Sequence, residues 1–181
     1  YVNTRARPGF EIDARAERTE MSYGTTIELR LLSKTSIVAE GTRGTTDFAE
    51  TASFLGTNLH DALNRTASTE SVALTHRVTP LTTLSASGSM SQDRFKFDPL
   101  RNSDSRTVSG TLRFDPAALI KGSVSVGYRD FRPASADLPG YKGSVVAANV
   151  SYVLLGMTRL AFDVGRDVQY SYDVNQPYYV Q

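Results

Sequence analysis

Apolar and polar side chains alternate with a period of two residues along most of this 181-residue chain. In residues 122–128, for example, Val124 and Val126 alternate with Ser123 and Ser125. Successive side chains of a β-strand leave opposite faces of its sheet, so a period of two indicates a strand with two different faces. The alternation therefore predicts long β-strands, each with one apolar and one polar face.

The polar faces carry small hydroxyl side chains, which are too hydrophilic for a protein core. One run alternates hydroxyl residues with apolar or small ones, and it comprises Thr83, Leu84, Ser85, Ala86, Ser87, Gly88, Ser89, Met90 and Ser91. A polar interior with an apolar exterior is typical of a transmembrane β-barrel. A soluble β-sandwich also alternates, but its outward face usually carries Lys and Glu rather than Ser and Thr. The sequence therefore favours an all-β, antiparallel up-and-down transmembrane β-barrel.

Short turns and longer polar connections alternate along the chain. We expect short turns at residues 7–9, 33–34, 79–81, 115–117 and 156–158, and the opposite connections at residues 21–24, 48–68, 96–105, 133–141 and 173–176. Outer membrane barrels combine short periplasmic turns with long extracellular loops. The asymmetry therefore predicts a location in the bacterial outer membrane.

These boundaries predict about eleven strands, many of them near the ~9–11 residues that a tilted strand needs to cross a bilayer. The expected strands cover residues 1–7, 10–20, 24–32, 35–47, 69–78, 82–95, 106–114, 121–132, 143–154, 158–172 and 177–181. We expect a single barrel domain over residues 1–181. The chain begins at Tyr1 and ends in residues that resemble the start of a strand, so we expect this domain to be truncated at both ends.

Strand parity assigns the two faces. We expect the following side chains to face lipid: Phe10, Ile12, Ile27, Leu29, Leu31, Val72, Leu74, Leu112, Phe114, Val124, Val126, Val146, Val150, Tyr152, Leu160, Phe162 and Val164. We expect the lumen to be lined by Glu28, Arg30, Glu40, Arg77, Arg113, Arg129, Arg159 and Asp163, together with Glu11, Asp13, Arg15, Glu17 and Asn149. Interfacial girdles are expected from aromatic residues near strand ends, namely Tyr23, Phe95, Phe114, Tyr128, Phe131, Tyr152, Tyr170 and Tyr172.

Arg166 breaks this parity, because it falls between Val164 and Val168 on an apolar face. Three explanations remain open. The side chain lies above the apolar band, it binds a lipid headgroup, or it follows a β-bulge that resets the register.

Composition excludes several classes of protein. No apolar run approaches the ~20 residues of a membrane-spanning helix, and the mean hydropathy is -0.29. With 20 basic and 19 acidic residues the net charge is +1, so nothing indicates a nucleic-acid partner. Cysteine is absent, which excludes disulfides, thiolate metal sites and cysteine nucleophiles.

Residues that could carry chemistry are sparse. His60 and His76 have no companion at metal-ligand spacing, so no metal is expected. Asp61, next to His60, is expected to belong to a helical turn over residues 60–65 and not to a catalytic triad, and the chain has no Gly-x-Ser-x-Gly motif. We therefore expect no enzyme activity, no catalytic residue and no cofactor.

Four segments of the carboxyl-terminal part resemble a known family. They are Phe114-Asp115-Pro116, Val126-Gly127-Tyr128-Arg129-Asp130-Phe131, Leu154-Leu155-Gly156-Met157-Thr158-Arg159-Leu160 and Arg166-Asp167-Val168-Gln169-Tyr170-Ser171-Tyr172. Over about residues 69–181 the chain is similar to the outer membrane β-barrel porins associated with exopolysaccharide export, and before that only the hairpin rhythm agrees. The resemblance implies a barrel of roughly sixteen to eighteen strands, of which this chain would supply a part.

Two functions are compatible with this sequence. The resemblance implies a passive conduit for exopolysaccharide across the outer membrane, with lipid or lipopolysaccharide around it and a periplasmic polysaccharide export protein as a partner. The alternative is an outer membrane scaffold or adhesin that transports nothing and whose long connections, chiefly residues 48–68, bind a partner.

Overall fold

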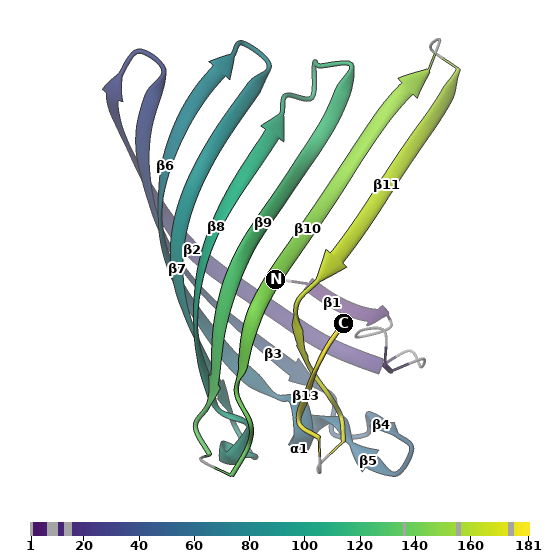
Figure 1. The fold of residues 1–181 in the computed structure, drawn as a ribbon. Coiled ribbons are helices and arrows are strands. Elements are labelled where there is room, and N and C mark those ends of the chain that lie inside the picture. The colour runs from purple at the N-terminus through teal and green to yellow at the C-terminus, as the bar shows by residue number, and fades with distance from the viewer. Residues whose placement is uncertain (1, 7–10, 13–15, 136, 155–156, 174–175) are drawn as a thin grey trace.

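The computed structural model describes residues 2–6, 11–12, 16–135, 137–154, 157–173 and 176–181. Most of them lie in one antiparallel sheet of nine strands in the order β1-β2-β3-β6-β7-β8-β9-β10-β11 (Figure 1). The bounds are β1 (Val2–Ala6), β2 (Ala16–Leu32), β3 (Thr35–Phe48), β6 (Arg65–Thr79), β7 (Thr82–Phe95), β8 (Ser103–Phe114), β9 (Ile120–Pro133), β10 (Tyr141–Leu154) and β11 (Thr158–Arg166). Pairing between successive strands of this sheet confirms the predicted all-β, up-and-down fold.

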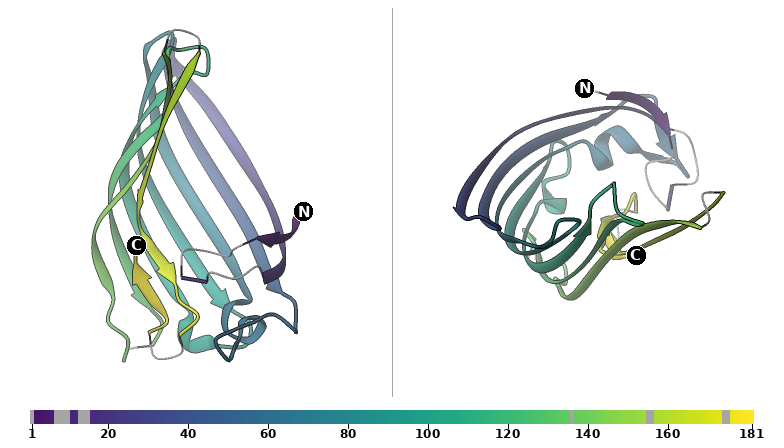
Figure 2. Two further views of the ribbon diagram at one scale, coloured as in Figure 1. Left: turned by 90° about the vertical axis from the view of Figure 1, so that its right-hand side faces the viewer. Right: turned by 90° about the horizontal axis from the view of Figure 1, so that it is seen from above.

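The sheet curves into part of a barrel and leaves one side open (Figure 2). Among the described residues, β2 pairs over residues 21–32 with β3 alone, since β1 reaches only as far as Glu20. In the same described part of the chain, β11 pairs along Thr158–Arg166 with β10 alone. Unpaired backbone groups cost several kcal/mol each in hydrocarbon, so a membrane barrel requires further strands along both of these edges.

Short turns and long connections lie at opposite ends of the strands (Figure 1). At the short-turn end, residues 33–34 join β2 to β3, residues 80–81 join β6 to β7, and residues 115–119 join β8 to β9. At the long-loop end, the connection from β3 to β6 contains β4 (Ser53–Phe54), β5 (Thr57–Asn58) and α1 (Leu59–Leu63), and the connection from β7 to β8 contains the 3₁₀ helix η1 (Pro99–Arg101). The predicted asymmetry of the two rims is confirmed.

The predicted helical turn forms as α1. The Asn58 side chain caps it by accepting a hydrogen bond from the His60 backbone nitrogen at 2.9 Å, because the first amides of a helix have no partner within the helix. At the other end, Asn64 is buried and its Oδ1 accepts a hydrogen bond from the Phe48 backbone nitrogen at 2.6 Å. Among the described residues, no helix is long and apolar enough to cross a bilayer.

The connection predicted at residues 21–24 does not exist. β2 runs without a break from Ala16 to Leu32, and Tyr23 and Gly24 pair with Arg43 and Thr42 of β3. Gly24 fits because a Cβ there would come within 2.8 Å of the Gly41 carbonyl oxygen. The short Ser-Tyr-Gly segment at residues 22–24 resembles a turn in its local sequence, but pairing with β3 keeps its backbone extended.

The expected strand over residues 158–172 is also wrong. β11 ends at Arg166, and a separate strand, β12 (Val168–Tyr170), pairs with β13 (Tyr178–Val180) in a small sheet on the concave side (Figure 2). Together with the continuous β2, this gives nine strands in the main sheet instead of the expected eleven or so. The turn predicted at residues 7–9 and the assignments of Phe10, Asp13 and Arg15 lie outside the described residues.

A packed apolar cluster fills the concave side at the long-loop end. Its buried members are Ile12, Ala16, Phe48, Leu59, Ala62, Leu63 and Phe95. Ile12 was expected to face lipid, and Phe95, Phe131, Tyr170 and Tyr172 were expected in an interfacial girdle, so these five assignments are wrong. Instead, Phe95 packs edge-on against Tyr170 at 4.9 Å, and Phe131 lies 4.7 Å from Tyr178 between ring centroids.

Candidate functional site

Hydroxyl side chains of neighbouring strands meet in rows on the concave face. Ser87 and Ser109 are hydrogen-bonded at 2.9 Å between Oγ atoms, because the β7–β8 register places them opposite each other. Ser91 and Ser105 form a second such pair at 2.7 Å, and Thr111 donates to Ser125 at 3.1 Å. These rows form a polar wall over β7, β8 and β9.

The structure places all eight of the predicted lumen residues on this concave face. The residues are Glu28, Arg30, Glu40, Arg77, Arg113, Arg129, Arg159 and Asp163, and the registers carry the assignment from strand to strand. Arg77 pairs with Thr83, which in turn pairs with Arg113. Asp163 accepts a hydrogen bond from the Asn149 side-chain nitrogen at 2.6 Å, as expected for two side chains that share a face.

Two neighbouring predictions at the long-loop end have different outcomes. Glu11 lies on the concave side, where its carboxylate accepts hydrogen bonds from Ser171 Oγ at 2.8 Å and from the Tyr172 backbone nitrogen at 3.2 Å. Glu17 was expected in the lumen, but β2 parity places it on the face opposite Arg18. The assignment was wrong because β2 is continuous, so its even-numbered residues face inward throughout.

Ion pairs at the long-loop end join residues that are distant in sequence. Arg129 Nη1 lies 2.7 Å from Asp167 Oδ1, and Arg129 Nη2 donates to Ser105 Oγ at 3.0 Å. Arg65 lies 3.5 Å from Asp93, and its guanidinium stands over the Tyr170 ring at 5.0 Å. Opposite charges therefore neutralise each other in this half of the concave face.

The long-loop end of the concave side also contains polar contacts that the alternation of apolar and polar residues did not predict. Arg101 is only 3% exposed, and its guanidinium donates to the backbone oxygens of Ser171 and Asp173. The Ser103 and Tyr170 hydroxyls are 2.5 Å apart, and burial raises the pKa of Tyr170. These residues lie in connections or beside strand ends, where side-chain alternation carries no information. Only Asp98, three residues before Arg101 and paired with it at 2.8 Å, gave a local signal.

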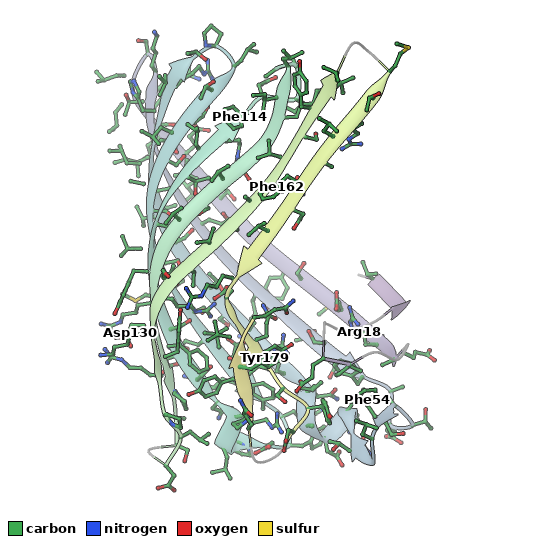
Figure 3. The ribbon with its side chains drawn as sticks, turned by 45° about the vertical axis from the view of Figure 1, so that its right-hand side comes forward. Arg18, Phe54, Phe114, Asp130, Phe162 and Tyr179 are labelled. Atoms are coloured by element: carbon green, nitrogen blue, oxygen red, sulfur yellow. The ribbon has the colours of Figure 1, made fainter. Side chains whose placement is uncertain are left out.

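The convex face is apolar and exposed. Large side chains on it include Ile27, Leu29, Val72, Leu74, Leu84, Met90, Val108, Val126, Leu160, Phe162 and Val164. Figure 3 shows Phe114 and Phe162 in the half of the molecule nearer the short turns, whereas Arg18, Phe54 and Tyr179 lie towards the long-loop end. A molecule with this much uncovered apolar surface on one face needs an apolar environment there.

Arg166 keeps the parity of Val164 and lies on the convex side. The ladder between β10 and β11 runs without a shift up to the pair Val146–Arg166, so the explanation by a preceding bulge is wrong. Its guanidinium donates to the Ser144 hydroxyl at 3.1 Å. The strand ends at Arg166, and the backbone nitrogen and oxygen of the next residue, Asp167, both bond to Gln181.

The two histidines have separate local partners. His60 Nδ1 lies 2.9 Å from Asp61 Oδ1, and its ring packs against Phe97 at 4.5 Å. His76 Nδ1 lies 2.9 Å from the Thr35 hydroxyl. Among the residues that the structure describes, no group of three or more His, Cys, Asp or Glu side chains is arranged to hold a metal ion.

Comparison with known proteins assigns this arrangement to a family. The family model described as Putative beta-barrel porin 2 matches residues 5–181. No curated protein and no solved structure matches the chain. The matched range includes all the main-sheet strands apart from the first residues of β1. A match of this extent, together with the polar concave and apolar convex faces, means that the chain belongs to the Putative beta-barrel porin 2 family.

Proposed function

We propose that this chain forms part of a passive conduit that carries exopolysaccharide across the bacterial outer membrane. The observation that supports the proposal is the wall of hydroxyl side chains over β7, β8 and β9 on the concave face, opposite an apolar convex face. In a closed barrel the concave face borders water and the convex face borders lipid. The family supports a porin-like role, and the polysaccharide is our proposal.

A wall of serine and threonine suits a sugar polymer that must move. Each hydroxyl can donate one hydrogen bond and accept up to two. Many equivalent contacts can therefore form and break in turn as the polymer slides. Conduction requires binding that is favourable enough for the ligand to enter and weak enough for it to leave. Small side chains such as Ser87 and Ser109 also leave space for water and for sugar rings.

Closure is part of the proposal. The free edges of β2 and β11 must pair with further strands before the concave face can enclose water. The surrounding lipid or lipopolysaccharide would contact the convex face, and a periplasmic polysaccharide export protein would deliver the polymer to the short-turn end. The proposal needs no catalytic group and no cofactor.

The scaffold or adhesin alternative receives less support from the longest connection. In residues 49–64, Leu59, Ala62 and Leu63 are buried in the packed cluster, so this connection folds inward against the barrel wall. Its main exposed apolar side chain is Leu55 at the tip of the β4–β5 hairpin. A connection that packs inward narrows a conduit more readily than it presents a binding surface.

A flux assay on the intact protein separates the two functions. The protein is reconstituted into planar bilayers and into liposomes loaded with labelled oligosaccharide, and conductance and sugar release are measured. We expect both to rise above protein-free controls. Absence of both, combined with ligand binding that is lost when residues 51–57 are replaced by a Gly-Ser linker, would support the scaffold and overturn the conduit.

A further inference from the structure

Four arginines lie on the concave face close to the short turns. They are Arg30 of β2, Arg77 of β6, Arg113 of β8 and Arg159 of β11. Each is among the three residues of its strand that are nearest the short-turn end. The four strands are distributed across the sheet, so the positive charges line the rim of the concave face instead of forming one local cluster.

The registers determine how close these charges are. Thr83 of β7 pairs with Arg77 on one side and with Arg113 on the other. Adjacent strands are ~4.8 Å apart, so the backbones of these two arginines are about 10 Å apart. Arg30 and Arg77 also line one cavity of about 90 Å³, together with Lys34 and the hydroxyls of Ser36, Thr75 and Thr83. A ligand bound between two such charges lies about half this spacing from each, within the Debye length of ~8 Å at physiological ionic strength, so both charges act on it.

Nearby carboxylates among the described residues offset only part of this charge and do not pair directly with the four arginines. Glu28 lines the same cavity, Asp163 lies further along β11 and accepts from Asn149, and Asp115 caps its own turn by accepting from the Ala117 nitrogen at 2.8 Å. Within the described part of the chain, none of the four rim arginines has a carboxylate oxygen within 4.0 Å.

The long-loop end of the same face is different. Four arginines on that end, Arg18, Arg65, Arg101 and Arg129, are each within 3.5 Å of a carboxylate oxygen, from Glu20, Asp93, Asp98 and Asp167 respectively. These arginines are therefore held in direct ion pairs at one end of the concave face, whereas the rim arginines at the other end are not paired with any carboxylate that the structure describes, and the cavity there has three basic side chains to one carboxylate. Such a gradient attracts anions to the short-turn end and offers them no equally strong site at the far end.

We propose that the four rim arginines make the short-turn mouth selective for anions, and that the polymer this protein carries is polyanionic, with carboxylate, phosphate or sulfate groups on its sugars. The proposal rests on the conduit function proposed above. Arginine presents a planar set of donors that matches these oxyanions and keeps its charge at any physiological pH. Rings of Arg or Lys select anions in other pores by the same physics.

The test is the ion selectivity of the intact protein in planar bilayers. A KCl gradient across the bilayer gives a reversal potential, from which the ratio of chloride to potassium permeability follows. We expect the wild type to prefer chloride, and the double variant Arg77→Glu, Arg113→Glu to lower the ratio several-fold or invert it. The control is Arg43→Glu, which makes one such Arg-to-Glu exchange on the convex face, half the charge change of the double variant, and should leave the ratio unchanged.

The outcomes distinguish the two proposals. A protein that inserts but does not conduct contradicts the conduit itself. A protein that conducts with equal permeability for both ions, or whose selectivity responds to Arg43→Glu as strongly as to the double variant, overturns the anion mouth alone. If the Glu variant does not assemble, the Arg77→Gln, Arg113→Gln variant must still reduce the preference for chloride. Release of dextran sulfate from liposomes should exceed release of neutral dextran of equal size, and the double variant should remove this difference.

Discussion

Arg129 and Asp167 form an ion pair on the concave face, with 2.7 Å between Nη1 and Oδ1, although 38 residues separate them in the chain. Arg129 lies within β9, and Asp167 is the single residue between the end of β11 and the start of β12. The same carboxylate oxygen accepts from the Val168 backbone nitrogen at 2.7 Å. The pair therefore attaches the β12–β13 hairpin to the inner wall of the sheet.

Replacement of Asp167 should loosen this attachment. In Asp167→Asn the Arg129 guanidinium, whose side chain is 16% exposed, loses its charged partner in a partly buried site. We expect a loss of about 1–3 kcal/mol in the free energy of unfolding, measured by urea titration of the folded protein in detergent. Asp130→Asn is the matched control, because it removes an exposed pair with Arg132 and should lower the free energy of unfolding much less. Equal costs for the two variants would contradict the attachment.

The assignment of faces predicts opposite effects of the same new charge on one strand. Val126 is 56% exposed on the convex face of β9, and Ser125 points to the concave face beside Thr111. Val126→Arg should cost ~2–4 kcal/mol, because a charge is placed in the lipid, whereas Ser125→Arg should leave assembly nearly unchanged. Urea titration in lipid vesicles measures both. A larger loss for Ser125→Arg would reverse the assignment.

Thiol labelling tests the same faces without a large change in stability. Cysteines introduced at Ser123 and Ser125 should react with a water-soluble thiol reagent, while cysteines at Val124 and Val126 should be shielded by lipid. Gly127 is unsuitable as a third concave position, because a Cβ there would lie 2.6 Å from the Val108 carbonyl oxygen. Labelling in the opposite phase would show that the polar face is outside.

Any substitution of Gly122 should destabilise the fold. Its φ is +115°, and a Cβ on it would lie 1.9 Å from the Asn149 carbonyl oxygen of β10, so both its backbone conformation and its space require glycine. Gly122→Ala should reduce the folded fraction of the protein, measured by the shift in mobility between heated and unheated samples on a gel. Gly110→Ala should have little effect, since nothing lies within 4 Å of the added Cβ. A fully assembled Gly122→Ala protein would contradict this reading of the β9–β10 contact.

Alternation by itself determined the fold class and the facing of most strand residues. Side chains on successive residues of a strand point to opposite sides because of the local backbone geometry, so the faces of Val126 and Arg113 follow without knowledge of any neighbour. The rims were predictable for a similar reason, since Pro80 and the Asp115-Pro116 pair restrict the backbone where they stand. These properties depend on a few adjacent residues.

Pairing and packing between distant residues were decided only in the tertiary structure. Tyr23 lies in a strand and not in a loop because it pairs with Arg43 of β3. The residues next to Tyr23 in sequence carry no information about this pairing. Phe95 and Phe131 are aromatic residues near strand ends, as in an interfacial girdle. They nevertheless pack inward, because the β12–β13 hairpin brings Tyr170 and Tyr178 against them. The charge gradient along the concave face has the same origin. Arg129 is neutralised by a residue 38 positions away, whereas Arg113, on the same face, is paired in register with Thr83 and Ser123, and this difference exists only once the strands have aligned.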